Sequence, residues 1–394
     1  MKIKILIIFF LACWTVVSYA AATDFRTVTF INQCSFPVWF GLSGAVAQNS
    51  QKQGFSCQKN TDCASGSSCV QGRCFWDNPK PANGNYRLEK LGGQNSVIIP
   101  MNNNDRDQIW SGVIAGRTNC TNGSCETADC GNDAGGCQAG RGFNQPATQA
   151  EPTLNFSKDF YDVEVINGVN IPVSMGPSKP GSTSSNPYEC GNPGAVDPIT
   201  NVGKCDWNKM TPPSNDFLWV TNEGNPCSSD HDCAAPYQCG LSFNPGQQHL
   251  LQKRCGRLLG YWTANQVCGI DGSFGSPFNC SQHPLSSSYS VTQLYQCSGV
   301  PSCYADNAKN NCCGCVDWWT KGINVPANPF TSQCVSSNLA WMQAIEPNLE
   351  WLKRACPTAY TFPYDDVSST FTCAQKNANQ VNSTDYTITF CPKG

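Results

Sequence analysis

The chain has 394 residues with a formal net charge of −3, and only 13% of its residues are charged. A typical soluble domain has about a quarter of its residues charged, and binding to nucleic acid or anionic lipid needs a basic surface. Nucleic acid and membrane surfaces are therefore excluded as expected partners.

The N-terminal stretch predicts a secretory signal. Lys2 and Lys4 precede an apolar run over residues 5–17, and small residues surround Ala20. A basic start, a short apolar run and small residues at its end are typical of a signal peptide, and the run is too short to span a membrane. We expect residues 1–20 to be removed near Ala20, leaving a secreted mature chain, 21–394, without a membrane span.

Most of the remaining chain predicts β-structure. Short segments rich in Val, Ile, Thr and Phe alternate with Gly, Pro and Asn, as strands and their turns do. Strands are expected within 26–33, 95–100, 162–166, 369–373 and 385–390. The chain is therefore mainly β with long loops.

Two cysteine-rich segments share one spacing. Residues 57–74 and 227–239 both contain C-x5-C-x5-C with Asp before the second cysteine. Export favours small disulfide knots over metal sites, so we expect no metal and no cofactor. They are interpreted as stapled insertions, about 54–77 and 225–256. In the first, Cys57 is expected to pair with Cys69 and Cys63 with Cys74; in the second, the fourth cysteine is expected at Cys255.

The segment 159–172, DFYDVEVINGVNIP, combines a strand pattern with several acids. Side chains alternate along a strand, so Asp162, Glu164 and Ile166 share one face. Asn167-Gly168 is a hairpin-turn pair. The acids have two interpretations: the solvated face of a half-buried strand, or a working acid group.

Helical spacing is found late in the chain. Leu339, Met342 and Ile345 recur three apart, and Pro347 suits the first turn of a second helix that ends near Cys356. The sequence therefore predicts a few short helices, concentrated within 338–356.

Cysteine and sequon counts agree with export. The chain has 27 cysteines, and removing Cys13 with the signal leaves 27 − 1 = 26, enough for up to 13 disulfides. Candidate N-glycosylation sites are Asn119, Asn122, Asn155, Asn279 and Asn382.

The chain lacks the common catalytic signatures. It has no G-x-S-x-G elbow, no P-loop and no H-E-x-x-H, and His231, His249 and His283 are scattered. The remaining chemistry is that of paired carboxylates, which glycoside hydrolysis uses as one protonated acid and one ionised base or nucleophile. Carboxylates also bind sugar hydroxyls without catalysis.

Several blocks in register resemble thaumatin-like proteins. They are VTFINQCSFPVW (28–39), GRTNC (116–120), DFYDVEVINGVNIPVSM (159–175), CPTAYTFPYDDVSSTFTC (356–373) and YTITFCP (386–392). The middle of the chain is similar to the longer microbial and fungal forms. The resemblance implies an antiparallel β-sandwich core with disulfide-rich loop lobes, an acidic cleft beside the larger lobe, and binding of β-1,3-glucan.

The resemblance also implies cleft positions. Glu151, Asp162 and Asp365 match the family's Glu and two of its Asp residues, whereas Asn167 replaces the third Asp and Val113 replaces the Arg. Asp366, next to Asp365, could take over its role, or the pair could simply cap a turn. Loss of the cation should raise the carboxyl pKa values, and Asn cannot act as a carboxylate base. The site is therefore expected to bind β-1,3-glucan but to hydrolyse it weakly or not at all.

Disulfide pairs are implied in the same way: Cys34 with Cys391, Cys190 with Cys373 and Cys205 with Cys356. Six more cysteines are expected in disulfides: Cys120, Cys125, Cys130, Cys137, Cys303 and Cys312.

Three functions remain open. The first is a monomeric secreted protein that binds β-1,3-glucan or a related cell-wall polysaccharide, with a role in defence or wall remodelling. The second is a weak endo-β-1,3-glucanase with Glu151 as the acid and Asp162 or Asp365 as its partner. The third is an extracellular scaffold or inhibitor that binds protein through the two knots. Asn167 disfavours the second, and nothing specifies a partner for the third.

Overall fold

The computed structural model describes residues 24–47, 56–63, 67–76, 80–101, 109–131, 136–179, 185–198, 203–244, 247–304, 311–328 and 330–393. The expected signal peptide lies outside the described residues. Within them, no helix is long and apolar enough to cross a membrane.

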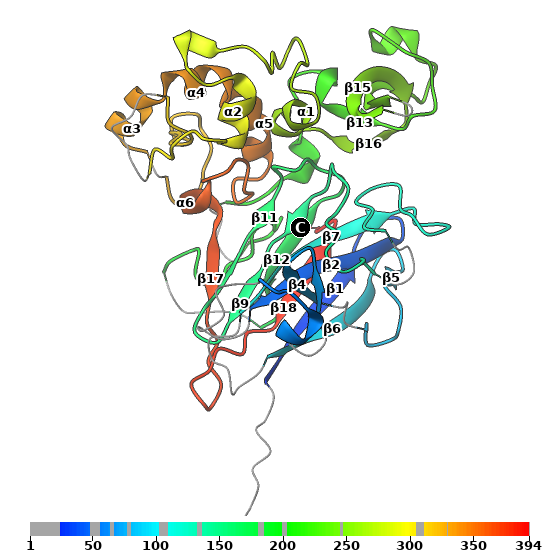
Figure 1. Ribbon diagram of the computed structural model, residues 1–394, viewed down its shortest axis with the longest axis vertical. Coiled ribbons are helices and arrows are strands. Elements are labelled where there is room, and N and C mark those ends of the chain that lie inside the picture. The colour runs from blue at the N-terminus through cyan, green and yellow to red at the C-terminus, as the bar shows by residue number, and fades with distance from the viewer. Residues whose placement is uncertain are drawn as a thin grey trace, which may run out of the picture.

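Two stacked sheets form the lower part of the molecule (Figure 1). The smaller sheet has the order β12-β18-β1-β6. Its strands are β1 (Asp24–Asn32), β6 (Gly93–Met101), β12 (Val173–Pro177) and β18 (Tyr386–Phe390). In β18, Tyr386, Ile388 and Phe390 are buried while the two threonines between them are half-buried, the alternation expected of a strand with one face in the core. β1 and β18 run parallel, so this sheet joins the two ends of the chain and is mixed rather than wholly antiparallel.

The larger sheet has the order β17-β10-β9-β7-β2-β4-β3, with three short strands pairing beside this path. Its strands are β2 (Val38–Ala47), β3 (Ser67–Val70), β4 (Arg73–Trp76), β5 (Arg87–Leu88), β7 (Ile109–Thr118), β8 (Gln149–Ala150), β9 (Thr153–Asn155), β10 (Asp159–Tyr161), β11 (Val163–Glu164) and β17 (Phe371–Cys373). Phe30 and Phe40 stack between the sheets with ring centroids 4.1 Å apart. The fold is therefore a β-sandwich, as expected.

The expected strand over 162–166 is broken. β10 pairs with β17 and β9, whereas β11 pairs with β8, and Asp162 lies at the break. The Asn167-Gly168 turn forms with Gly168 at φ 85°, but β12 then pairs with β18 in the other sheet. The predicted hairpin is therefore wrong, because the turn sends the chain across the sandwich rather than back along the same sheet.

A lobe of helices and one small sheet covers one end of the sandwich (Figure 1). The sheet order is β15-β14-β13-β16. These strands are β13 (Leu218–Val220), β14 (Gln238–Asn244), β15 (Gln247–Gly256) and β16 (Leu258–Tyr261). The helices are α1 (Ala264–Ile270), α2 (Val291–Gln296), α3 (Ser332–Ser337), α4 (Leu339–Ala344), α5 (Pro347–Ala355) and α6 (Asp366–Ser369). Pro347 begins α5, as predicted, and the lobe has its own core around Trp262, Trp318 and Trp341.

Disulfides stabilise both the sandwich and the lobe. The three long-range pairs are Cys34–Cys391, Cys190–Cys373 and Cys205–Cys356. The first knot contains Cys57–Cys69 and Cys63–Cys74, and the second contains Cys227–Cys239 and Cys233–Cys255. Shorter loops are closed by Cys120–Cys125, Cys130–Cys137, Cys268–Cys280, Cys303–Cys312 and Cys315–Cys334. A pair that closes a loop of 100 or more residues stabilises the fold by about 4–5 kcal/mol in the chain-entropy model.

Candidate functional site: an acidic trough on the larger sheet

Two adjoining cavities form a trough on the larger sheet. They have volumes of 610 and 510 Å³ and share Glu151, Phe160 and Asp162, which lie where the cavities meet. Val113 lines the first cavity and Asn167 lines the second. Each volume falls within the range of about 300–1,000 Å³ that is usual for ligand pockets. Four of the five predicted cleft positions therefore lie on one continuous surface.

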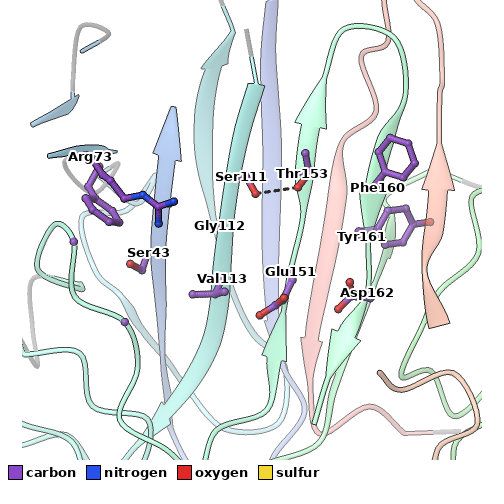
Figure 2. Close-up of a pocket in the computed structure, with 14 residues that line it drawn as sticks. Ser43, Arg73, Ser111, Gly112, Val113, Glu151, Thr153, Phe160, Tyr161 and Asp162 are labelled. Carbon is purple, nitrogen blue, oxygen red and sulfur yellow. Dashed lines mark hydrogen bonds between the residues drawn. The ribbon is translucent and has the colours of Figure 1, made fainter. Parts of the chain in front are cut away.

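The first cavity crosses the strands of the sheet, from β4 to β10. Figure 2 shows Ser43, Ser111 and Thr153 along its floor, with Glu151 and Asp162 at one end. The Ser111 and Thr153 hydroxyl oxygens lie 2.9 Å apart. Phe160, which is exposed on β10, adds an aromatic surface beside the acids. This floor combines small hydroxyl groups with an aromatic ring.

The second cavity contains a carboxyl group that the sequence analysis did not assign to the cleft. Glu164 is only 4% exposed and is in hydrogen-bond contact with Glu151. Gln149 Nε2 donates to Glu164 Oε2 over 2.6 Å, and the backbone N–H of Asn167 donates to Glu164 Oε1 over 2.9 Å. Asn167 Nδ2 also donates to Glu164 Oε2, at 3.1 Å. Asn167 thus holds a carboxyl group in the cleft instead of supplying one.

Burial raises the pKa values of three acids in the trough. Burial raises the pKa of Asp162 well above its ordinary range, and the charges of Glu151 and Asp366 raise it further. Burial also raises the pKa of Glu164, to which the charge of Glu151 adds. The pKa of Glu151 is raised by burial, although its hydrogen bond with Glu164 lowers it. Glu151, Asp162 and Glu164 therefore retain protons at a pH where ordinary carboxyl groups are ionised, and can donate as well as accept hydrogen bonds.

One acceptor in this group is unpartnered. Asp162 Oδ1 is buried and has no hydrogen-bond partner among the described residues. Buried polar atoms are usually paired, and an orphaned one at a functional surface needs an explanation. A hydroxyl group of a ligand in the trough would satisfy it.

The predicted position of Asp365 in the cleft is wrong. Asp365 is 2% exposed, and its Oδ2 accepts from Lys353 Nζ at 2.8 Å and from the Thr361 backbone N–H at 3.0 Å. Lys353 is fully buried and also donates to the Ala359 carbonyl at 2.9 Å. The Asp365 carboxylate is therefore occupied by a buried cation beneath the surface.

Its neighbour Asp366 lies on the trough instead. Asp366 is exposed at the start of α6 and lines the second cavity together with Tyr360. Burial raises the pKa of the Tyr360 hydroxyl, and the charge of Asp366 raises it further. The four cleft acids are therefore Glu151, Asp162, Glu164 and Asp366.

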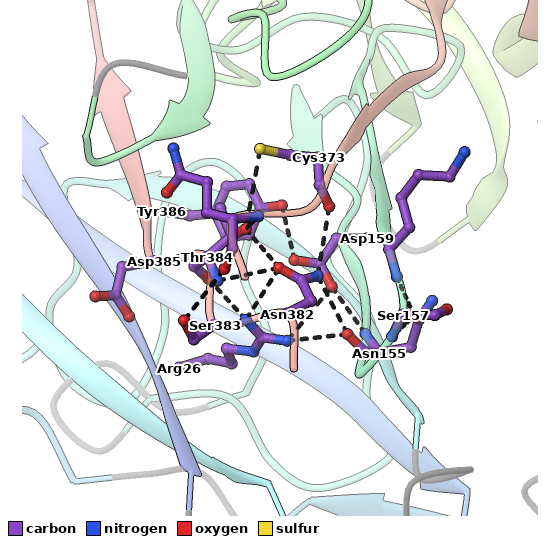
Figure 3. Close-up of polar contacts among 12 residues, drawn as sticks. Arg26, Asn155, Ser157, Asp159, Cys373, Asn382, Ser383, Thr384, Asp385 and Tyr386 are labelled. Carbon is purple, nitrogen blue, oxygen red and sulfur yellow. Dashed lines mark hydrogen bonds and ion pairs between the residues drawn. The ribbon is translucent and has the colours of Figure 1, made fainter. Parts of the chain in front are cut away.

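One predicted glycosylation site is incompatible with the fold. Asn382 is fully buried, and its Nδ2 donates to the Asn155 carbonyl at 3.2 Å and to the Cys373 carbonyl at 3.4 Å. Figure 3 shows Asn382 inside a polar network that includes Arg26 and Asp159. A glycan on Asn382 would disrupt this network. Asn119 and Asn122 are exposed, and their sequons stay predictions.

Sequence reasoning also missed Arg73. This residue follows a turn inside the first cysteine knot, and nothing in its local pattern links it to the acids. In the structure it lines the first cavity with Glu151 and Asp162. Glu164 did carry a signal, because strand alternation placed it on the same face as Asp162.

A disulfide-rich β-sandwich with an acidic trough beside a helical lobe is the architecture that the thaumatin-like resemblance implied. The thaumatin family model matches residues 81–392, and the chain belongs to this family. A pathogenesis-related thaumatin-like protein 3.5 from Cryptomeria japonica is 27% identical over 379 residues, covering 95% of this chain and 91% of the relative.

Other relatives are similarly distant. An osmotin-like protein from Nicotiana tabacum is 27% identical over 84% of this chain and 83% of its own. Thaumatin-like protein 1 from Prunus persica is 26% identical over 73% of this chain and 74% of its own. A solved thaumatin-like xylanase inhibitor is 25% identical, covering 38% of this chain and 76% of that chain, with a TM-score of 0.23. This last superposition is too poor for the two sites to be compared.

Proposed function

We propose that this is a secreted protein that binds β-1,3-glucan or a related cell-wall polysaccharide along the acidic trough, in defence or wall remodelling. The observation that carries the proposal is the continuous surface of two cavities that meet at Glu151 and Asp162. Hydroxyl, carboxyl and aromatic side chains line this surface, and they are the groups that hydrogen-bond sugar hydroxyls and cover apolar sugar faces. The disulfides support export, since such density is rare in reducing compartments.

Weak endo-β-1,3-glucanase activity is a second candidate, favoured by the raised pKa of Glu151 and by the extra carboxyl group of Glu164. A general acid needs a raised pKa. Glu151 and Glu164 are nevertheless in direct contact, whereas the two carboxyl groups of a glycosidase are about 5 Å or more apart. Asp365 cannot assist, because it is paired with Lys353. Asp162 remains the partner for Glu151, and binding should exceed hydrolysis.

The proposal is tested by co-sedimentation with insoluble β-1,3-glucan, with release of reducing sugar measured in the same samples. Asp162→Ala should weaken binding by about 1–3 kcal/mol, the usual cost of leaving a buried hydrogen-bonding group without its partner. Glu223→Ala is the control, because Glu223 is exposed and lies outside both cavities. Equal binding by the two variants would overturn the trough as the site. Rapid cleavage that survives Glu151→Gln would show that the chemistry lies elsewhere.

A further inference from the structure

The first cysteine knot is part of the sheet that carries the trough. β3 and β4 form a hairpin inside the knot, and β4 pairs with β2 through Ala45 and Phe75. Five adjacent strands, β10, β9, β7, β2 and β4, therefore form one continuous surface. Neighbouring strands are ~4.8 Å apart, so β10 and β4 are separated by roughly 19 Å along this surface.

The knot supplies the far end of the trough. Arg73 and Phe75 on β4 line the first cavity together with Gly140 and Gly142. Figure 2 shows the Arg73 guanidinium directed past Ser43 into the cavity, at the end opposite Asp162. The trough thus has carboxyl groups at one end and a cation at the other.

The backbone at Arg73 is fixed by the knot, while its side chain is free to contact a ligand. Cys74, the next residue, is buried and bonded to Cys63. Gly140 packs closely against β3 of the same hairpin, since a Cβ at position 140 would lie 3.0 Å from Val70 Cγ1. The Arg73 side chain is exposed and has no ion pair or side-chain hydrogen bond with any described residue. The knot therefore presents a free guanidinium on a rigid support.

A neutral sugar would leave that guanidinium without a charged partner. A guanidinium group has a planar fork of N–H donors that matches a carboxylate, and it remains charged at every physiological pH. Phe75 beside it offers an apolar face for a sugar ring. The Ser43, Ser111 and Thr153 hydroxyls between the two ends suit uncharged sugar units.

We infer that Arg73 and Phe75 form a subsite for an acidic sugar, so the polysaccharide bound in the trough carries a uronic acid carboxylate at the knot end. This inference rests on the proposed glycan-binding function and narrows its ligand class. Arg73 is the residue that determines specificity, and the insertion of the knot is what places it there.

The test measures binding by calorimetry with three oligosaccharides of equal length. One is a neutral β-1,3-gluco-oligosaccharide, and the other two each carry a single glucuronic acid, at opposite ends. At low salt one acidic ligand should bind the unmodified protein about fivefold tighter than the neutral one, the scale of one charge pair near the surface. This advantage should shrink at high salt, because exposed charges are screened.

Matched variants separate this subsite from the rest of the trough. Arg73→Gln should abolish the fivefold advantage of the acidic ligand over the neutral one, both measured with the same variant. Arg87→Gln is the control, because Arg87 pairs with Glu89 and lies outside both cavities. Asp162→Ala should weaken binding of all three ligands.

Each outcome decides between the two claims. Equal binding of neutral and acidic ligands, or an advantage that survives Arg73→Gln, overturns the acidic-sugar subsite while the glycan-binding function stands. Binding of only an acidic ligand supports the subsite and overturns neutral β-1,3-glucan as the ligand. Failure of all three to bind overturns the proposed function and the subsite together.

Discussion

Asp365 and Asp366 are neighbours in the chain, but one is buried and the other is exposed, so substituting each tests which of them belongs to the trough. Asp365→Asn and Asp366→Asn remove one charge each, one residue apart, without changing side-chain size. Asp365 is paired with the buried Lys353, whereas Asp366 is exposed on the second cavity. We expect the first variant to lose stability and the second to lose glycan binding.

The expected loss follows from the partners of Lys353. Its ammonium group donates to Asp365 Oδ2, to the Ala359 carbonyl, and to the hydroxyls of Ser368 and Ser369, all at 2.7–2.9 Å. Without the carboxylate, a fully buried cation keeps only neutral acceptors. Removing one partner of a buried ion pair costs about 3–5 kcal/mol. An exposed substitution such as Asp366→Asn usually changes stability by about 0.5 kcal/mol or less.

Denaturant unfolding with the disulfides intact, followed by tryptophan fluorescence, measures the free energy of unfolding. Co-sedimentation with β-1,3-glucan measures binding of the same preparations. An Asp365→Asn variant destabilised by less than about 1 kcal/mol would refute the interpretation of the buried pair. Normal glycan binding by Asp366→Asn would remove Asp366 from the site.

Two further predictions concern protons and thiols. Burial raises the pKa values of Asp162 and Glu164, so the folded state keeps protons that the unfolded chain releases. These protons stabilise the folded state at low pH, and the stabilisation is lost as pH rises from about 4 through the raised pKa values. The melting temperature should fall over this pH range, and Asp162→Asn with Glu164→Gln should flatten the decline; an unchanged slope would contradict it. Cys297 and Cys313 are buried thiols in hydrogen-bond contact, and an exported thiol–disulfide oxidoreductase or dissolved oxygen should take up their two electrons and protons to form a disulfide. Thiol labelling of the denatured, unreduced protein should therefore find no free thiol, and two labelled cysteines would show that the pair stays reduced.

The strands of the sandwich were predictable because the alternation of apolar and polar residues that marks them is local in the sequence. Alternation marked β1 and β18, and Pro347 marked the start of α5. The broken strand at Asp162 was not predictable in this way. Its break depends on β10 pairing with β17 and β11 pairing with β8, and strand alternation carries no information about these partners.

The confusion of Asp365 with Asp366 has the same origin. Both acids occupy one turn, and a shift of one residue decides whether a side chain points into the core or out of it. The deciding contact is Lys353, a residue of α5 whose charge is buried at the end of the lobe. A motif aligned by sequence does not contain that contact.

The two departures at Val113 and Asn167 suggested a cleft that had lost a cation and an acid. In the folded chain, Glu164 brings a carboxyl group to Asn167, and Arg73 brings a cation to the cavity that Val113 lines. Neither replacement occupies the position of the residue that is missing: Glu164 lies three residues before Asn167 in the same block, and Arg73 lies in an inserted knot. Because packing can return a charge to a site from a distant segment, a missing motif residue predicts a changed geometry before it predicts a lost function. The change here is a separation of charge along the trough, with Arg73 of the knot at one end and the carboxyl groups at the other.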